Sequence, residues 1–233
     1  MREDLAELCQ QAIDRGDEAA LDKLLSREPR LTGTAIPVQR DWGEEQWLPL
    51  HLAAKAGALP LVERLIEAGA SIDSRTRFRT PMHGRETPLH LASRCGHDAI
   101  VARLLDAHAA PGLLDANHRS ALTGASQAGH LGIVARLVDA GAPLDPVDDS
   151  GRTPLHWAIA EGHVDVSLGL IAAGADPDHA CPKEPAGYTA LHRCAISGEA
   201  MQAVADALVA AGADATLRDP RFDKTAADLL AEA

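Results

Sequence analysis

Histidine has the most versatile chemistry of the residues in this chain, and it occurs eleven times. A histidine can bind a metal ion or act as a general base near neutral pH. Four of the eleven, however, end copies of one tetrapeptide, and three others follow a glycine at a recurring position. The rest lie in different segments without metal-ligand spacing, so we interpret the histidines as structural and expect no metal site. These remaining four are His83, His108, His118 and His179.

The tetrapeptide is Thr-Pro-Leu-His, which occurs twice and recurs in altered form three more times. The leucines of the five copies are 39, 33, 33 and 36 residues apart. A period near 33 residues predicts a repeat protein in which each unit is one supersecondary element that stacks on the next. The five copies are Leu48–His51, Thr87–His90, Ser120–Thr123, Thr153–His156 and Thr189–His192.

A second pattern indicates how each unit folds. A glycine follows each tetrapeptide leucine by seven residues, and a Gly-Ala or His-Ala pair comes about twelve residues later. We expect a short helix, a glycine turn, a second helix and a helix-ending glycine before an extended loop. The Thr hydroxyl suits an N-cap, and Pro suits the first helical turn. The turn glycines are Gly57, Gly96, Gly129, Gly162 and Gly198.

These coupled patterns resemble the ankyrin-repeat family over nearly the whole chain. The resemblance implies an all-α solenoid of stacked helix–turn–helix units with protruding β-hairpin-like fingers. We expect a single domain over 1–233: a divergent N-terminal repeat or cap (1–33), an inserted loop (34–47), five full repeats (48–219) and a truncated C-terminal cap (220–233). The resemblance also implies that the tetrapeptide histidines bond to the backbone of adjacent loops. His108 and His118 replace usual glycines, which predicts locally strained or shifted turns.

The sequence contains none of the catalytic motifs that we considered. The chain has no Gly-x-Ser-x-Gly elbow, no phosphate-binding glycine loop and no His-Glu-x-x-His motif. The neighbouring carboxylates Asp148 and Asp149 fit turn chemistry better than acid–base catalysis. Ankyrin stacks present surfaces and seldom enclose a dry pocket. We therefore expect no catalytic residues and no cofactor.

Charge and composition indicate which classes of partner the chain binds and in which cellular compartment it is expected. The formal net charge of −12 argues against nucleic acid or an anionic membrane as the main partner. No run of 18 apolar residues is present, and the first residues lack an apolar secretory stretch. The four cysteines show no paired spacing, so we expect reduced thiols and a cytoplasmic protein.

The residues that the repeat does not require predict where a partner binds. Five of the six aromatic residues belong to inter-repeat loops or their junctions, and Trp157 follows a tetrapeptide on a first helix, where the family leaves the position variable and exposed. Arginines also gather on the fingers and could bind carboxylates through their planar forks. The predicted partner-binding residues are Trp42, Trp47, Arg75, Arg77, Phe78, Arg79, Arg85, Arg119, Arg152, Trp157 and Tyr188.

Two alternatives stay open at this point. Trp42, Trp47 and Phe78 could instead fold back to cover their own long loops. The arginines could be neutralised in place by carboxylates on the same fingers, so that no basic patch exists. The acidic residues concerned are Glu44, Glu45, Glu86, Asp148 and Asp149.

The sequence thus predicts a non-enzymatic, monomeric protein-binding module, an adaptor or an inhibitor. Its partner is another protein, with an acidic segment as one possibility, bound on the concave face of fingers and first helices. Two other classes of function are alternatives: a regulatory subunit of a separately encoded enzyme, and a self-assembling structural repeat protein.

Overall fold

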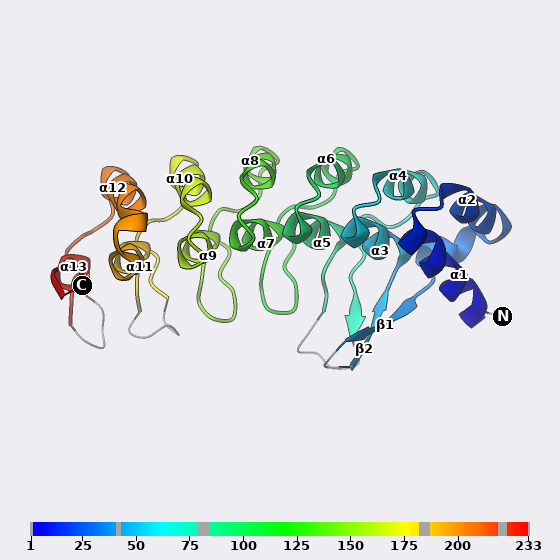
Figure 1. The fold of residues 1–233 in the computed structure, drawn as a ribbon, viewed down its shortest axis with the longest axis horizontal. Helices are drawn as coiled ribbons and strands as arrows, with labels where there is room; N and C mark the ends of the chain where they lie inside the picture. Colours follow the sequence, from blue (N-terminus) through cyan, green and yellow to red (C-terminus); the bar gives the residue numbers. More distant parts are fainter. Residues whose placement is uncertain (1, 41–42, 79–83, 182–186, 219–222, 233) are drawn as a thin grey trace. The chain divides into compact units, whose positions relative to one another are not determined.

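The computed structural model describes residues 2–40, 43–78, 84–181, 187–218 and 223–232 of the chain. The chain divides into two compact units, the N-terminal unit Met1–Asn117 and the C-terminal unit His118–Ala233. Each unit consists mainly of short helix pairs, as expected for an all-α ankyrin-repeat solenoid (Figure 1). That both units form one domain stays a prediction.

The N-terminal unit contains three helix pairs, and in each pair two short antiparallel helices meet at a tight turn (Figure 1). The first pair is the predicted divergent repeat, with Gly16 in its turn. A short 3-10 helix, η1 (Pro29–Gly33), follows it. The pairs are α1 (Arg2–Arg15) with α2 (Glu18–Arg27), α3 (Pro49–Ala56) with α4 (Leu59–Glu67), and α5 (Pro88–Cys95) with α6 (Asp98–Asp106).

The C-terminal unit repeats the arrangement and ends in a single helix where the truncated repeat is predicted. Within this unit the loop before α9 projects from the row of first helices, on the side away from α8 and α10 (Figure 1). The elements are α7 (Ala121–Gln127), α8 (Leu131–Asp139), α9 (Pro154–Ala160), α10 (Val164–Ala172), α11 (Ala190–Ser197), the 3-10 helix η2 (Gly198–Met201), α12 (Gln202–Ala210) and α13 (Ala226–Glu232).

The tetrapeptide begins each first helix by satisfying its free backbone groups. At α5 the Thr87 hydroxyl accepts a hydrogen bond from the His90 amide at 3.4 Å, and the His90 ring Nδ1 accepts from the Thr87 amide at 3.2 Å. Ser120 and Thr123 form the same reciprocal cap on α7. Gly57 ends α3 in the left-handed conformation, at φ 78°.

Several histidines bond to the backbone of other segments, which agrees with their structural interpretation. The ring Nε2 of His51 donates to the carbonyl of Ser74 at 2.9 Å, and that of His192 donates to Lys224 at 3.2 Å. The ring of His163 donates to the carbonyl of Gln127 at 3.1 Å and lies against Gly129, where a Cβ would come within 2.7 Å of the ring. Glycine at that turn therefore makes room for the histidine of the following repeat.

His108 and His118 adopt the strained turns that the sequence predicts. Their φ angles are 64° and 57°, in the left-handed region that favours glycine. The helix-ending turn keeps its shape even where glycine is absent.

The segment predicted as an inserted loop over 34–47 is more regular than expected. It forms a hairpin of β1 (Ile36–Arg40) and β2 (Gly43–Trp47), and β3 (Arg77–Phe78) pairs with β2 in the order β1-β2-β3. Both pairings are antiparallel, with Trp47 opposite Ile36. The insertion becomes a sheet because the next finger supplies a third strand to pair with it.

Aliphatic side chains fill the interior of each unit. The tetrapeptide leucines are all buried, from fully buried Leu122 and Leu155 to Leu191 at 7 % exposure. Buried alanines such as Ala92 and Ala158 let the first helices approach closely. Burial of this kind between neighbouring repeats replaces one central core.

Candidate protein-binding surface

Trp157 lies in the C-terminal unit, and its predicted exposure is wrong. The residue is on α9 directly after the tetrapeptide, but only 8 % of its surface is exposed. Its indole Nε1 donates a hydrogen bond of 2.8 Å to Oδ2 of Asp148, in the finger that precedes α9. The ring is buried because polar side chains from two fingers close over it.

Two arginines cover the indole. The guanidinium carbon of Arg119 lies 4.8 Å from the ring centroid of Trp157, and that of Arg152 lies 4.5 Å from it. Such contacts are attractive because the face of an aromatic ring is electron-rich. We call Arg119, Asp148, Arg152 and Trp157 the arginine–tryptophan cluster. It unites three of the predicted partner-binding residues in one place.

Asp148 is the carboxylate that organises this cluster. Its Oδ1 accepts hydrogen bonds from the backbone amides of Ser150, at 2.8 Å, and Arg152, at 3.0 Å. Its Oδ2 accepts from Trp157 and lies 3.7 Å from Nε of Arg119. The expected turn chemistry of Asp148 is confirmed, and the same carboxylate fixes the indole.

The alternative that carboxylates on the same fingers neutralise the arginines is true in part. Asp148 lies beside Arg119, while Asp149 forms a 2.7 Å ion pair with His118 when that ring is protonated. Glu86 pairs at 2.7 Å with Arg94 on α5, which the sequence did not single out. The side chains of Glu44 and Glu45 lie outside the described residues.

His156 directly precedes Trp157, and its ring is buried and neutral. The pKa of His156 is lowered to about 4, mainly by burial, and the neighbouring His179, Arg193 and Arg152 act in the same direction. The His179 ring meets it edge-on with centroids 5.7 Å apart.

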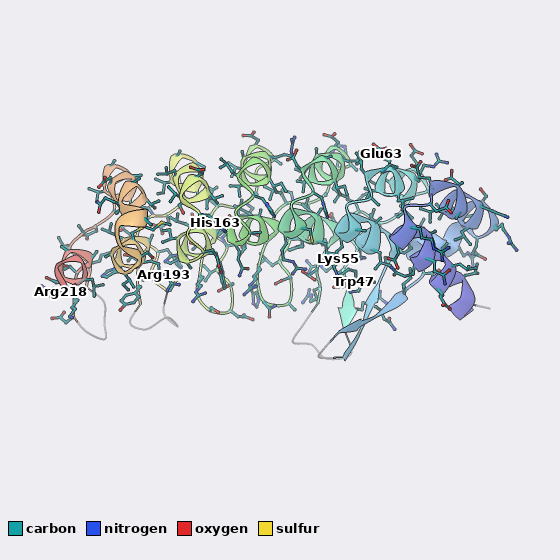
Figure 2. All side chains as sticks on the ribbon, in the orientation of Figure 1. Trp47, Lys55, Glu63, His163, Arg193 and Arg218 are labelled. Atoms are coloured by element: carbon teal, nitrogen blue, oxygen red, sulfur yellow. The ribbon has the colours of Figure 1, made fainter. Side chains whose placement is uncertain are left out.

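Arg193 is a functional candidate that the sequence interpretation missed. It follows His192 on α11 as Trp157 follows His156 on α9, so the two positions are equivalent in consecutive repeats. Figure 2 shows Arg193 on α11 of the C-terminal unit, and its side chain is half-buried. Alignment of the repeats by their tetrapeptides would have identified it.

Tyr188 is less accessible than its predicted contact role requires. Only 8 % of its surface is exposed, and its ring stacks on that of His192 with centroids 5.6 Å apart. Its carbonyl accepts a 3.1 Å hydrogen bond from the amide of Cys181, which closes the finger. Tyr188 therefore stabilises its own finger through these contacts.

In the N-terminal unit Trp47 is fully buried, and for this residue the alternative of covering its own loop is confirmed. The Lys55 ammonium lies 5.2 Å from its ring centroid, and the two lie side by side in Figure 2. Arg75 also serves the scaffold, since its Nη1 donates at 2.9 Å to the carbonyl of Leu114.

The other predicted contacts of the N-terminal unit divide into two groups. Arg77, on β3, and Arg85, at φ 60°, are exposed on one finger, whose strands join through hydrogen bonds between Thr76 and Glu86. Trp42, Arg79 and the side chain of Phe78 lie outside the described residues.

The four cysteines are free thiols, and three of them are buried. Cys9, Cys181 and Cys194 are buried, and Cys95 is exposed. Burial raises the pKa of Cys9 and of Cys194 to about 12, which keeps both thiols protonated and unreactive. Where the structure describes the chain, no group of three His, Cys, Asp or Glu side chains could hold a metal ion. Over the same residues no helix has the length and apolar character to span a bilayer.

Comparison with known proteins agrees with this architecture. The family model described as "Ankyrin repeats (3 copies)" matches residues 9–112 and 89–181. No curated protein matches the chain. Ankyrin repeats generally mediate protein–protein interaction, and proteins built from them are typically not enzymes. With most of its length matched by this model, the chain belongs to the ankyrin-repeat family.

Proposed function

We propose that this chain is a non-enzymatic protein-binding module and that its C-terminal unit binds a partner through the arginine–tryptophan cluster. The observation that carries the proposal is the close approach of Arg119 and Arg152 to the ring of Trp157, while Asp148 accepts the hydrogen bond of the indole Nε1.

The physical advantage of the cluster is that its arginines are ordered before the partner arrives. An arginine side chain loses about 2 kcal/mol of conformational entropy when it is fully immobilised. Stacking on the indole restricts both guanidinium groups in advance, so less of this loss falls on binding. Arginine is also enriched among the residues that dominate protein interfaces.

The proposal assigns Trp157 a different role from a direct anchor. A side chain with 8 % exposure offers little surface to a partner, whereas the Arg119 side chain is 34 % exposed. The guanidinium groups therefore make the contact, and the indole positions them. Arg77 and Arg85 are proposed as a second contact in the N-terminal unit, together with Trp42, Phe78 and Arg79 of the same fingers.

An adaptor or an inhibitor acting as a monomer fits this mechanism best. Rigid display of side chains requires no chemical step, and it can either join two proteins or cover a functional surface. The unpaired spacing of the cysteines supports a reducing compartment such as the cytoplasm.

Affinity capture from lysate of the source cells tests the proposal. The immobilised wild type is compared with the Arg119→Gln/Arg152→Gln variant and with Arg136→Gln, a matched loss of charge at an exposed position on α8. We expect at least one captured protein to be retained by the wild type and by Arg136→Gln but lost from the double variant. Equal retention by all three proteins would show that the cluster is not the binding site.

A further inference from the structure

We propose that Arg77 and Arg85 of the N-terminal unit together bind one phosphorylated side chain of a partner protein. The inference rests on the second contact of the proposed function and specifies the chemistry of its ligand. Three observations carry it: hydrogen bonds hold the two exposed arginines close together on one finger, Arg85 has a backbone conformation that favours glycine, and the described charges of the finger are mainly positive.

Backbone hydrogen bonds bring the two arginines close together. The amide of Arg85 donates to the carbonyl of Thr76 at 3.1 Å. That carbonyl belongs to the peptide group between Thr76 and Arg77, so standard backbone dimensions place the Cα atoms of Arg77 and Arg85 within roughly 7.5 Å of each other. Two long arginine side chains can converge on one anion across this distance.

The backbone between the two arginines is held by contacts on both sides. The amide of Thr76 donates to the carbonyl of Glu86 at 2.9 Å, and the Thr76 hydroxyl accepts from the amide of Glu86 at 3.1 Å. The carbonyl of Gly84 accepts from the amide of Ala116 at 3.0 Å, and β3, which contains Arg77, pairs with β2. The finger is therefore shaped before a ligand arrives, which lowers the entropy lost on binding.

Arg85 occupies a position that suits glycine. Its φ angle of 60° lies in the left-handed region. Thr76 bonds to both Arg85 and Glu86, which is the pattern of a β-bulge whose first residue is usually glycine. Residues held in such conformations occur most often at functional sites. An arginine where glycine would fold more easily indicates that its side chain is used.

The described charges of this finger favour an anion. Glu86 pairs at 2.7 Å with Arg94, and the Asp73 carboxylate accepts from the amide of Ala110 at 3.0 Å, so neither contact involves Arg77 or Arg85. Four arginines stand against two carboxylates here, in a chain with a net charge of −12. The charged residues described on the finger and on α5 behind it are Asp73, Arg75, Arg77, Arg85, Glu86 and Arg94.

Convergence of two guanidinium groups favours a phosphoryl group over a carboxylate. A phosphorylated side chain carries about 1.5–2 negative charges at pH 7 and three acceptor oxygens. It can therefore accept charge-assisted hydrogen bonds from two guanidinium forks at once. A carboxylate has one charge and two oxygens, which one fork already satisfies. Clusters of arginine are a recurring means of recognising phosphorylated segments.

Peptide titration followed by NMR tests the inference on the whole chain. The probe is the end-blocked peptide Gly-Ala-Ala-phosphoserine-Ala-Ala-Gly, and the reporters are the backbone amide resonances of Thr76 and Glu86. Control peptides carry serine or glutamate at the central position, and inorganic phosphate is titrated separately. We expect saturable shifts with the phosphopeptide, binding at least about tenfold weaker for both control peptides, and weaker binding of inorganic phosphate, which lacks the peptide contacts.

Protein variants locate the contact. Arg77→Gln and Arg85→Gln should each weaken phosphopeptide binding about tenfold, whereas Arg27→Gln, at an exposed position on α2, should change it by less than about twofold. Arg85→Gly separates recognition from folding, because glycine suits the left-handed turn. This variant should lose binding to the same extent without a lower melting temperature. A clear fall in its melting temperature would remove the backbone argument for Arg85.

Four other outcomes would overturn the inference: no binding of the phosphopeptide to the wild type, equal binding of a control peptide, equal weakening by Arg27→Gln, or binding of inorganic phosphate as tight as that of the peptide. The last would identify a site for a free anion instead of a protein partner. None of these outcomes decides the proposed function, because lysate capture tests Arg119 and Arg152 of the C-terminal unit. Conversely, failure of the capture experiment would leave a phosphopeptide site at Arg77 and Arg85 in place.

Discussion

Trp47 in the N-terminal unit and Trp157 in the C-terminal unit both lie beneath cationic side chains, but the cations come from different places. Trp47 ends β2 and is covered by Lys55 from the helix that follows it in the same repeat. Trp157 lies on a first helix and is covered by arginines from two consecutive fingers. The first arrangement closes one repeat on itself, and the second links two repeats at their surface.

The difference bears on the proposed role of Trp157, because the two kinds of cation differ in what they can offer a partner. Lysine is a point charge on a flexible stem, whereas arginine can stack by its face and still donate along its edge. At Trp157 the carboxylate of Asp148 also fixes the indole through a hydrogen bond of 2.8 Å. Both tryptophans are buried, Trp47 at 0 % and Trp157 at 8 % exposure, but Trp47 lies beside a lysine and Trp157 beside two arginines.

The largest expected effect is on stability, at Trp47 of the N-terminal unit. Trp47→Ala should lower the free energy of unfolding by about 3–5 kcal/mol, because Trp47 is fully buried and the change leaves a cavity. Urea denaturation measures the change, and partner binding at low temperature should persist while the protein remains folded. If the free energy of unfolding fell by less than about 1 kcal/mol, the hairpin would have to fill the cavity left by the indole, and Trp47 would not be needed for stability.

The second prediction concerns the buried histidines, one in each unit. Burial is the main reason why the pKa of His51 and of His156 is about 4 in the folded chain, against 6.5 for an ordinary histidine. Between these values the unfolded chain binds protons that the folded chain does not, so stability is complete above pH 6.5 and is lost as the pH falls toward 4. At pH 5 the loss is about 2 kcal/mol for each histidine.

Denaturation at pH 7 and pH 5 measures this loss, and His156→Thr serves as the matched variant. Threonine occupies the equivalent position at Thr123 and completes a helix cap there. The variant should lose less stability on acidification than the wild type. An identical pH dependence would mean that His156 titrates normally and is not buried as described.

Local patterns made the helical part of the fold predictable, because each helix pair depends on residues close in sequence. The caps at Thr87 and Ser120, the left-handed turn at Gly57 and the strained turn at His108 all follow from their own tetrapeptides and glycines. The hairpin over 34–47 did not follow, since its third strand comes from a different finger. Pairing between distant segments leaves no trace in a repeat pattern.

The candidate site was predictable in composition but not in geometry. Arg119, Arg152 and Trp157 were identified because the repeat does not require them. The predicted exposure of Trp157 failed because its surroundings depend on a finger from the preceding repeat, which brings Arg119 over the ring. Family variability at a position shows that it is tolerant of change, and it does not show that solvent reaches it.

The third prediction separates the two roles of Trp157. Trp157→Phe keeps an aromatic face for the arginines but removes the Nε1–H that Asp148 accepts. The lost hydrogen bond at a buried carboxylate should reduce the free energy of unfolding by about 1–2 kcal/mol. Partner affinity should also fall, because a poorly held ring positions Arg119 and Arg152 less well, and calorimetry with the captured partner measures this. Unchanged affinity would show that stacking suffices without Asp148.

The smallest expected effect tests the surface of the N-terminal unit. Arg77→Gln should change the free energy of unfolding by less than about 0.5 kcal/mol, because the side chain is exposed. Arg75→Gln, its neighbour on the same finger, should lower it by about 1 kcal/mol through loss of the bond to the Leu114 carbonyl. Comparing their melting curves therefore distinguishes an arginine available to a partner from one that the fold already uses. If Arg77→Gln destabilised the protein as much as Arg75→Gln, both arginines would belong to the scaffold, and the second contact surface would have to be given up.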